Sequence, residues 1–348
     1  MRAITFQGVE RVTVETVADP IIRETHDAIV EVRQAGVCGS DLHVYHGRET
    51  GLDIGTVLGH EFVGEVLEVG SAIDDLHVGD LVVSPFTTNC GKCQFCTQGL
   101  TSRCVQGQLF GWVEHGEGLH GAQAERVRVP LADSTLVPVP GGVTSEAALL
   151  AGDVLATGYY CAVQGGVGPG KAVAVLGCGP VGQMAVFAAL HLGAEKVLAL
   201  DSVRERLDLA RRLGAEVVDI ERQSPAEVIA ANTEGLGVDA VLEAVGSAAA
   251  SRLAFDLVRP GGTISAVGVH TEPQFPFSPT ETYDKNLTYR IGRCPARHYL
   301  AQVLTILSKT RFDPTVIISH RLPLTEGERA YRMFADRSDG CTKVILTT

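Results

Sequence analysis

The chain has 348 residues and a formal net charge of -12, with 29 Lys and Arg against 41 Asp and Glu. This length exceeds what one hydrophobic core usually serves, so two domains are expected. The acidic balance disfavours nucleic acid and anionic membranes as partners, and no apolar run approaches the roughly 20 residues that span a bilayer.

The first half of the chain predicts a β-rich domain. Residues 1 to about 150 contain short runs punctuated by Gly, Asp and Pro, namely ITFQGVERVTVE, DAIVEVRQAGV, EFVGEVLEVG, LVVSPF and AERVRVP. Such punctuation is typical of an irregular all-β barrel. The N-terminus alternates apolar and polar residues and lacks the continuous apolar segment of a signal peptide. We therefore expect a first strand there and a cytoplasmic protein.

Residues 89–104, NCGKCQFCTQGLTSRC, hold four of the nine cysteines, at positions 90, 93, 96 and 104. In a reducing cytosol thiols stay free or bind metal, and an odd number excludes complete disulfide pairing within one chain. The spacing of Cys90, Cys93, Cys96 and Cys104 lets four sulfur atoms converge on one zinc ion. Four unligated buried thiols are the alternative, but the polar residues between them favour an exposed loop. The segment predicts a closed structural zinc site.

The pattern changes after PVPGGVTSEAALLAGD to alternating strands and helices. KAVAVLG, CGPVGQMAVFAALHLGA, KVLAL and SVRERLDLARRLGA follow one another. This alternation predicts βαβ units on a parallel sheet. A helix at HYLAQVLTILSKT and a strand at KVILTT are expected to return to the first domain. We therefore predict one domain at 1–153 with 293–348 and a second at 154–292.

A dinucleotide fingerprint opens the second domain. Gly177, Gly179 and Gly182, with Pro180 and Val181 between them, form G-x-G-x-x-G directly after a strand and at the start of a helix. The glycines permit the tight turn, the close approach of a pyrophosphate and helix–strand packing. The helix N-terminus offers backbone N–H groups to the phosphates.

Asp201 ends the second strand, 19 residues after Gly182, where the fingerprint places an acid for the ribose. A carboxylate there binds the ribose hydroxyls and repels a 2′-phosphate, so NAD is expected in preference to NADP. Capping of the SVRERL helix is an alternative role for Asp201, and nearby Arg204 and Arg206 leave room for some NADP.

A nucleotide domain beside a zinc loop is typical of a dehydrogenase, which also needs an open metal site. Cys38 in GVCGSDLH and His60 in GHEFVGEV are the candidate ligands in the β-rich half. Taken alone, a cysteine is usually a small buried hydrophobe, and a histidine often satisfies only a local hydrogen bond. Together, with Asp41 and Glu61 close by, they indicate a metal site.

The motifs CGSDLH, GHEFVGEVLEVG, VGDLVV, the four-cysteine loop and GCGPVG occur in this order along the chain. In this the chain resembles the zinc-dependent medium-chain alcohol dehydrogenase family. LHGAQAERVRVP and LLAGDVLATGYY further resemble its formaldehyde-dehydrogenase-like branch, and the likeness to threonine and polyol dehydrogenases is weaker. The resemblance implies an α/β protein with an N-terminal GroES-like β-rich catalytic domain and a Rossmann domain, a doubly wound parallel sheet that binds NAD.

The resemblance also implies a catalytic zinc ion. Cys38 and His60 match the first two ligands, and Asp153 stands where better-known members have a cysteine and the formaldehyde-dehydrogenase-like branch has an aspartate. A carboxylate oxygen is an acceptable zinc ligand. Glu61 matches a residue that approaches or ligates the zinc in some members. If Glu61 closes the site, Asp153 only caps the helix that follows it.

Further residues are matched to the substrate and the cofactor. Asp41 matches an acid that orients the ligand histidine, Ser40 a hydroxyl that contacts the substrate oxygen, and His43 a histidine that passes the proton to solvent. The residues matched to the NAD site are Thr157 beside the nicotinamide, Arg206 near the ribose, Val267 and Val269 at the carboxamide, and Lys343 at the pyrophosphate. Phe86, Leu109 and Trp112 are matched to the substrate pocket. For these last two groups, plain core packing is the alternative.

The sequence thus predicts an oxidoreductase that holds two zinc ions per chain and transfers a hydride between NAD and a small primary or secondary alcohol, or its aldehyde or ketone. A threonine or polyol dehydrogenase shares every motif and is one alternative. A non-catalytic NAD- or zinc-binding relative is another, against which the intact candidate ligands and the net charge of -12 argue. By family resemblance we expect a homotetramer, with a homodimer as the alternative.

Overall fold

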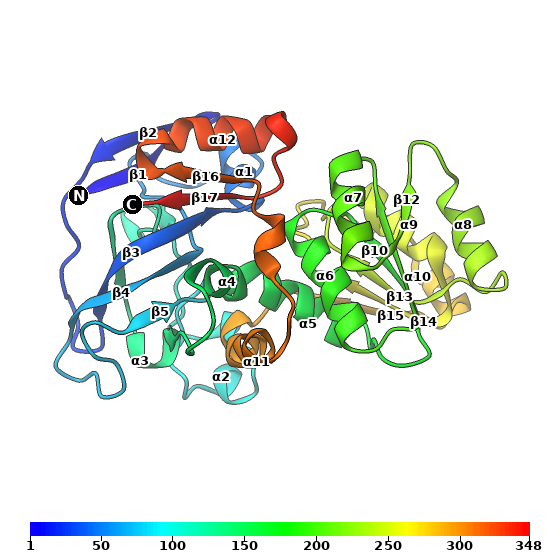
Figure 1. The fold of residues 1–348 in the computed structure, drawn as a ribbon, viewed down its shortest axis with the longest axis horizontal. Helices are drawn as coiled ribbons and strands as arrows, with labels where there is room; N and C mark the ends of the chain where they lie inside the picture. Colours follow the sequence, from blue (N-terminus) through cyan, green and yellow to red (C-terminus); the bar gives the residue numbers. More distant parts are fainter. The chain divides into compact units, whose positions relative to one another are not determined.

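Two structural units make up the chain in the computed structural model, which describes residues 1–348. Met1–Ala156 and Pro295–Thr348 form unit 1, and Thr157–Cys294 form unit 2. The boundaries predicted from the sequence, 153/154 and 292/293, lie a few residues before these points of division. Figure 1 shows the C-terminal segment, in red, beside the blue N-terminal strands of unit 1.

Unit 1 is built on a seven-stranded, mainly antiparallel sheet with the order β16-β17-β3-β4-β5-β9, in which β8 also pairs with β3. Its strands are β3 (Ala28–Val37), β4 (Phe62–Val69), β5 (Leu81–Val83), β8 (Arg126–Val129), β9 (Val137–Pro138), β16 (His320–Pro323) and β17 (Val344–Thr347). Two hairpins accompany this sheet: β1 (Arg2–Gly8) with β2 (Arg11–Thr16), and β6 (Trp112–Glu114) with β7 (Glu117–Leu119). The C-terminal strand β17 pairs with β3, so it completes the sheet that the N-terminal half begins.

The helices of unit 1 are α1 (Asp41–Tyr45), α2 (Gln94–Thr97), α3 (Ala132–Thr135), α4 (Ser145–Leu150), α11 (Ala296–Lys309) and α12 (Gly327–Asp336). A π-helical turn (Ala151–Leu155) continues α4 into α5 (Ala156–Gln164), which belongs to unit 2 from Thr157 onward. One apolar core of unit 1 forms where α12 packs with β1 and β17, and Ile4, Tyr331 and Leu346 are fully buried in it. No helix of the chain is both long and apolar enough to cross a bilayer.

Unit 2 contains a six-stranded parallel sheet with the order β12-β11-β10-β13-β14-β15. Its strands are β10 (Ala172–Leu176), β11 (Lys196–Asp201), β12 (Glu216–Asp219), β13 (Val238–Glu243), β14 (Val258–Ala266) and β15 (Thr288–Ile291). The helices between and around these strands in the sequence are α6 (Pro180–His191), α7 (Arg204–Leu213), α8 (Pro225–Asn232), α9 (Ala248–Leu257) and α10 (Pro279–Asp284). The order of the strands reverses between β10 and β13, as in a doubly wound nucleotide-binding fold. The predicted fold class is confirmed.

Candidate active site and metal centres

Four potential metal ligands gather in unit 1. The ligand atoms of Cys38, His60, Glu61 and Asp153 all lie within 4.8 Å of one another. The sheet brings the first three together, because Cys38 follows β3, the pair His60–Glu61 precedes β4, and these two strands are antiparallel neighbours. Asp153 comes from the π-helical turn after α4. Such turns occur often at functional sites.

Hydrogen bonds orient the imidazole of His60. Its Nδ1 lies 3.2 Å from Asp41 Oδ1, and its Nε2 lies 3.5 Å from Asp153 Oδ2 and 3.2 Å from Ser40 Oγ. Asp41 also accepts a hydrogen bond from the backbone N–H of Cys38 at 2.9 Å. The predicted contact between Asp41 and His60 is therefore present, and it leaves Nε2 facing the other ligands. The ring of Phe86 stands edge-on to the imidazole, with centroids 6.4 Å apart.

Burial and neighbouring groups shift the pKa values of these side chains. Burial raises the pKa of Cys38 to about 11. Burial opposes the cationic form of His60, but the carboxylate of Asp41 raises its pKa well above the usual value. Burial likewise opposes ionisation of Asp153, but its hydrogen bond with His60 lowers its pKa to about 2. A metal that takes the thiolate and the neutral imidazole must displace protons, so its affinity weakens as the pH falls.

The carboxylate of Glu61 forms an ion pair with a buried cation. The ammonium group of Lys343 binds Glu61 Oε2 and donates to the carbonyl oxygen of Val37 at 3.0 Å. A Cβ at Gly36 would lie 1.8 Å from Glu61 Oε2, so only glycine leaves room for this side chain. Lys343 is fully buried. In the structure the charge of Lys343 pairs with Glu61 in the metal pocket, and its contact with the pyrophosphate stays a prediction.

The donor set fits zinc. A thiolate, an imidazole nitrogen and carboxylate oxygens are all accepted zinc ligands, and a catalytic site needs three protein ligands with one position left open. Cys38, His60 and Asp153 provide such a set. Glu61 Oε1 is buried and has no hydrogen-bond partner, so it is placed to approach a metal as well.

The competing role of Asp153 as a helix cap does not match the backbone. The N-cap of α4 is Thr144, whose side chain accepts from Ala147 N. Leu150 and Ala156, which flank the π-helical turn, and Ala151, which begins it, all have right-handed helical dihedrals, so Asp153 lies inside one continuous helical segment.

Two residues that support the metal ligands through hydrogen bonds were not predicted from the sequence. Gln123 Nε2 donates to Asp41 Oδ2 at 3.2 Å and to the carbonyl oxygen of Gly36 at 3.0 Å. The buried Tyr331 hydroxyl donates to Gln123 Oε1 at 2.7 Å. The sequence feature that could have indicated Gln123 is its position in the small-residue run LHGAQA, because a polar side chain among small residues is often buried with a hydrogen-bond partner.

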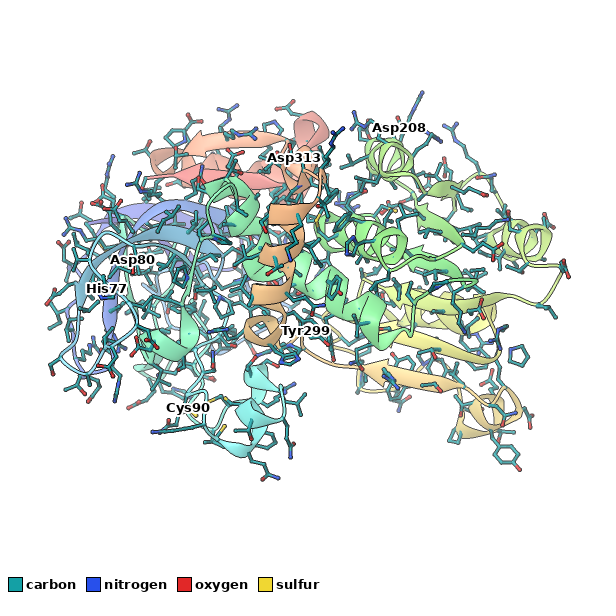
Figure 2. The ribbon with its side chains drawn as sticks, turned by 60° about the horizontal axis from the view of Figure 1, so that its bottom comes forward. His77, Asp80, Cys90, Asp208, Tyr299 and Asp313 are labelled. Atoms are coloured by element: carbon teal, nitrogen blue, oxygen red, sulfur yellow. The ribbon has the colours of Figure 1, made fainter.

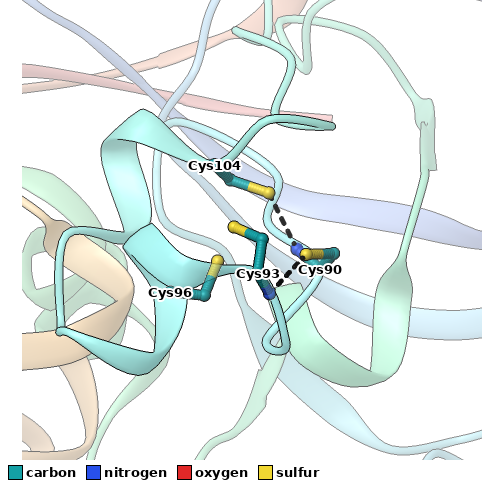
Figure 3. A group of neighbouring side chains, drawn as sticks. All are labelled: Cys90, Cys93, Cys96 and Cys104. Carbon is teal, nitrogen blue, oxygen red and sulfur yellow. Dashed lines mark hydrogen bonds between the residues drawn. The ribbon is translucent and has the colours of Figure 1, made fainter.

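The second cluster contains the four cysteines of residues 89–104 (Figure 3). Their sulfur atoms lie within 4.8 Å of one another, and all nine cysteines of the chain are free. Cys90 N donates to Cys104 Sγ at 3.2 Å, and Cys93 N donates to Cys90 Sγ at 3.4 Å. Backbone N–H groups lower the pKa of Cys93 to about 6. Convergent sulfur atoms that accept backbone hydrogen bonds are typical of a structural zinc site.

The glycine fingerprint forms the turn between β10 and α6. Gly177 has a φ of +83°, and a Cβ at Gly182 would lie 1.7 Å from the carbonyl oxygen of Gly177. Gly179 is the N-cap of α6, and Pro180 and Val181 begin the helix. The first backbone N–H groups of this helix have no intrahelical partner, and phosphate binding there stays a prediction.

Asp201 ties this turn to the end of β11. Its Oδ2 accepts from Cys178 N at 2.6 Å, and its Oδ1 accepts from Ser202 N and Val203 N, each at 2.8 Å. The N-cap of α7 is Val203, so Asp201 is not the cap of that helix. Arg206 Nη1 lies 3.9 Å from Asp201 Oδ2.

The remaining predicted residues lie at the ends of these elements. Thr157 is buried in α5, one helical turn after Asp153. Val267 N donates to the carbonyl oxygen of Glu243 at 2.9 Å, and the side chain of Val269 is 38% exposed. His43 is half-buried in α1, and its Nδ1 has no hydrogen-bond partner.

Comparison with known proteins identifies two family domains. Residues 24–141 match the alcohol dehydrogenase GroES-like domain, and residues 180–309 match the zinc-binding dehydrogenase domain. Zinc-type alcohol dehydrogenase B of Aspergillus flavus is 42% identical over 342 residues, which cover 96% of this chain and 78% of that one. The glutathione-independent formaldehyde dehydrogenase of Pseudomonas aeruginosa is 37% identical over 70% of this chain and 65% of that one. An alcohol dehydrogenase from Thermus sp. ATN1 has a similar structure, with a TM-score of 0.94, 45% identity, and coverage of 100% of this chain and 99% of that one.

Proposed function

The chain belongs to the zinc-dependent medium-chain alcohol dehydrogenase family, and we propose on this basis that it interconverts a small alcohol and its aldehyde or ketone with NAD as the cofactor. The observation that carries the proposal is the convergence of Cys38, His60 and Asp153 in a buried site beside Ser40. A relative that only bound zinc or NAD would have no need for this second, polar site.

When bound, zinc supplies a Lewis acid for the substrate oxygen and NAD supplies the hydride acceptor. The residues of the chain handle the proton. Ser40 Oγ lies 3.2 Å from His60 Nε2, so its hydroxyl borders the metal site and can accept a hydrogen bond from the alcohol. His43 follows within α1, and burial lowers the pKa of its imidazole. A neutral imidazole can accept a proton and release it to solvent.

The test of this function is a panel of alcohols and aldehydes monitored by NADH absorbance, combined with elemental analysis of the same preparation. We expect turnover of at least one small alcohol and two zinc ions per chain, one for each ligand cluster. Preferred turnover of threonine or a polyol would select the alternative within the family. Active protein that contains a single zinc ion would contradict the two-site assignment.

We propose NAD over NADP because the Asp201 carboxylate ends β11 where a 2′-phosphate would lie. The variant Asp201→Asn removes the charge, and we expect its kcat/KM with NAD to fall by about tenfold or more, because a hydrogen bond to a charged group contributes about 1.5–3 kcal/mol. The ratio of NADP to NAD efficiency should rise.

The neighbouring cation gives a matched control for this cofactor prediction. Arg206→Gln leaves Asp201 in place and removes the positive charge beside it, so it should lower the use of NADP relative to NAD. If both variants keep the parental ratio of the two efficiencies, Asp201 serves only to tie the glycine turn to β11.

We also propose that the protein is a cytoplasmic homotetramer, with a homodimer as the alternative. This proposal is supported by the family resemblance.

A further inference from the structure

A cavity of about 280 Å³ lies in unit 1 between the cysteine lobe (residues 89–104) and the start of α11. Asn89, Cys96 and Thr101 line it from the lobe, and Arg297 and His298 line it from α11. Figure 2 shows the lobe, marked by Cys90, next to the end of α11 that carries Tyr299. The cavity is separate from the site around Cys38, since no residue is common to the two.

Arg297 brings an uncompensated positive charge to this cavity. Its Nε donates to the carbonyl oxygen of Ser134 at 2.9 Å, but its guanidinium forms no ion pair with a carboxylate anywhere in the chain. Burial alone acts on the pKa of Arg297, which it lowers. A guanidinium nevertheless stays charged in proteins, and a partly buried charge without a counter-ion is unfavourable.

Two residues that line the cavity carry buried polar groups without hydrogen-bond partners. Asn89 is 2% exposed and Thr101 is 7% exposed. The Nδ2 of Asn89 and the Oγ1 of Thr101 are buried and have no hydrogen-bond partner. Buried polar atoms nearly always have one, so a donor that lacks a partner points to a group that the protein alone does not provide.

We propose that this cavity binds a small oxyanion, a carboxylate or a phosphate group, between Arg297, Asn89 and Thr101. The guanidinium matches either oxyanion through its paired N–H groups, and the amide and hydroxyl groups add donors. No Asp or Glu lines the cavity, and Cys96 is the one lining residue that carries negative charge when zinc is bound. A volume of about 280 Å³ suits a small organic anion or a phosphate group and excludes a whole dinucleotide.

Bound anion stabilises the cysteine lobe. Asn89 directly precedes Cys90, and Cys96 itself lines the cavity, so a ligand that bridges Asn89 to Arg297 links the lobe to α11. A ligand that binds only this folded arrangement shifts the equilibrium toward it. The competing explanation is that Arg297 only offsets the negative charge of zinc-bound sulfur atoms.

The experiment is calorimetric titration of the zinc-loaded protein at fixed ionic strength in a buffer free of carboxylate and phosphate. Inorganic phosphate is the probe in one arm and malonate in the other. We expect saturable binding of at least one probe, and the tighter of the two identifies the source of the oxyanion. Arg297→Gln should weaken that binding by about tenfold to a hundredfold, the range for one hydrogen bond to a charged group. Thr101→Val, which keeps all charges, should weaken it by a smaller factor.

Arg103→Gln is the matched control, because it removes an exposed arginine from the same lobe outside the cavity. This variant should bind the probe as the parent does. The proposal is overturned if neither probe binds saturably, or if Thr101→Val and Arg297→Gln both bind with parental affinity. It is also overturned if Arg103→Gln weakens binding as much as Arg297→Gln does. If Arg297→Gln loses zinc, Thr101→Val decides alone, and parental affinity in Thr101→Val then leaves Arg297 as a counter-ion of the sulfur atoms.

Discussion

Asp153→Asn is expected to lose most turnover and the zinc ion of the Cys38 site while the protein stays folded. The substitution keeps the shape of the side chain and removes the anionic ligand. We expect kcat to fall by about a hundredfold or more, because even residues that only support a metal ligand contribute about 10–100-fold. Steady-state kinetics, zinc analysis and circular dichroism of the same preparation check this result.

Glu61→Gln is the matched control for Asp153→Asn, since it makes the same change of charge on the other carboxylate of the site. We expect Glu61→Gln to keep more zinc than Asp153→Asn, because Glu61 Oε2 is already held by Lys343. The assignment is wrong if Asp153→Asn retains near-parental turnover with two zinc ions and Glu61→Gln loses one. The third ligand would then be Glu61.

Cys93→Ser is expected to remove the second zinc ion and to destabilise the protein. The lobe has little apolar contact of its own, since Cys93, Cys96 and their neighbours in α2 are not buried. The binding energy of a structural zinc ion is therefore folding energy for this segment. We expect the Tm to fall by about 5 °C or more, because each kcal/mol shifts the Tm of a domain of this size by about 2–4 °C.

Gln98→Ser serves as the control for Cys93→Ser, because Gln98 is an exposed residue of the same lobe and is not a zinc ligand. This variant should keep two zinc ions and the parental Tm. Calorimetry and zinc analysis report both quantities. A Cys93→Ser protein that melts with the parent and retains two zinc ions would show that the cysteine cluster holds no structural metal.

The nucleotide unit could be predicted in detail because its signals are local. The glycine turn, the apolar strand before it and the acid at the end of the next strand all follow from short-range spacing, and the fold of unit 2 matches them. The cysteine cluster is equally local, since its four ligands lie within residues 89–104.

The catalytic pocket was only partly predictable because its contacts are distant in sequence. Lys343 reaches Glu61 across 282 positions, and Tyr331 reaches Gln123 across 208. No spacing rule predicts a contact between residues so far apart in the sequence, and a lysine near a C-terminus is usually expected to lie on the surface. The family resemblance matched Lys343 only to a phosphate, whereas the sheet also pairs its ammonium group with Glu61 and with the carbonyl oxygen of Val37 in the interior. Asp201 shows the same limit, because its bond to Cys178 N depends on how β10 and β11 align.

The pairing of β17 with β3 also sets an order of assembly during synthesis. Unit 2 is synthesised in full before residue 295 is added, and domains generally fold as units as they emerge from the ribosome. Unit 1 cannot complete its sheet until β17 has been synthesised. Before then, the part of β3 that pairs with β17 is an unpaired strand edge, which favours association with other chains. The buried carboxylate of Glu61 also lacks its ion-pair partner, Lys343. A ribosome-stalled or prematurely terminated chain therefore carries a finished nucleotide fold without a finished metal pocket. The metal pocket can therefore be completed only after β17 has been synthesised.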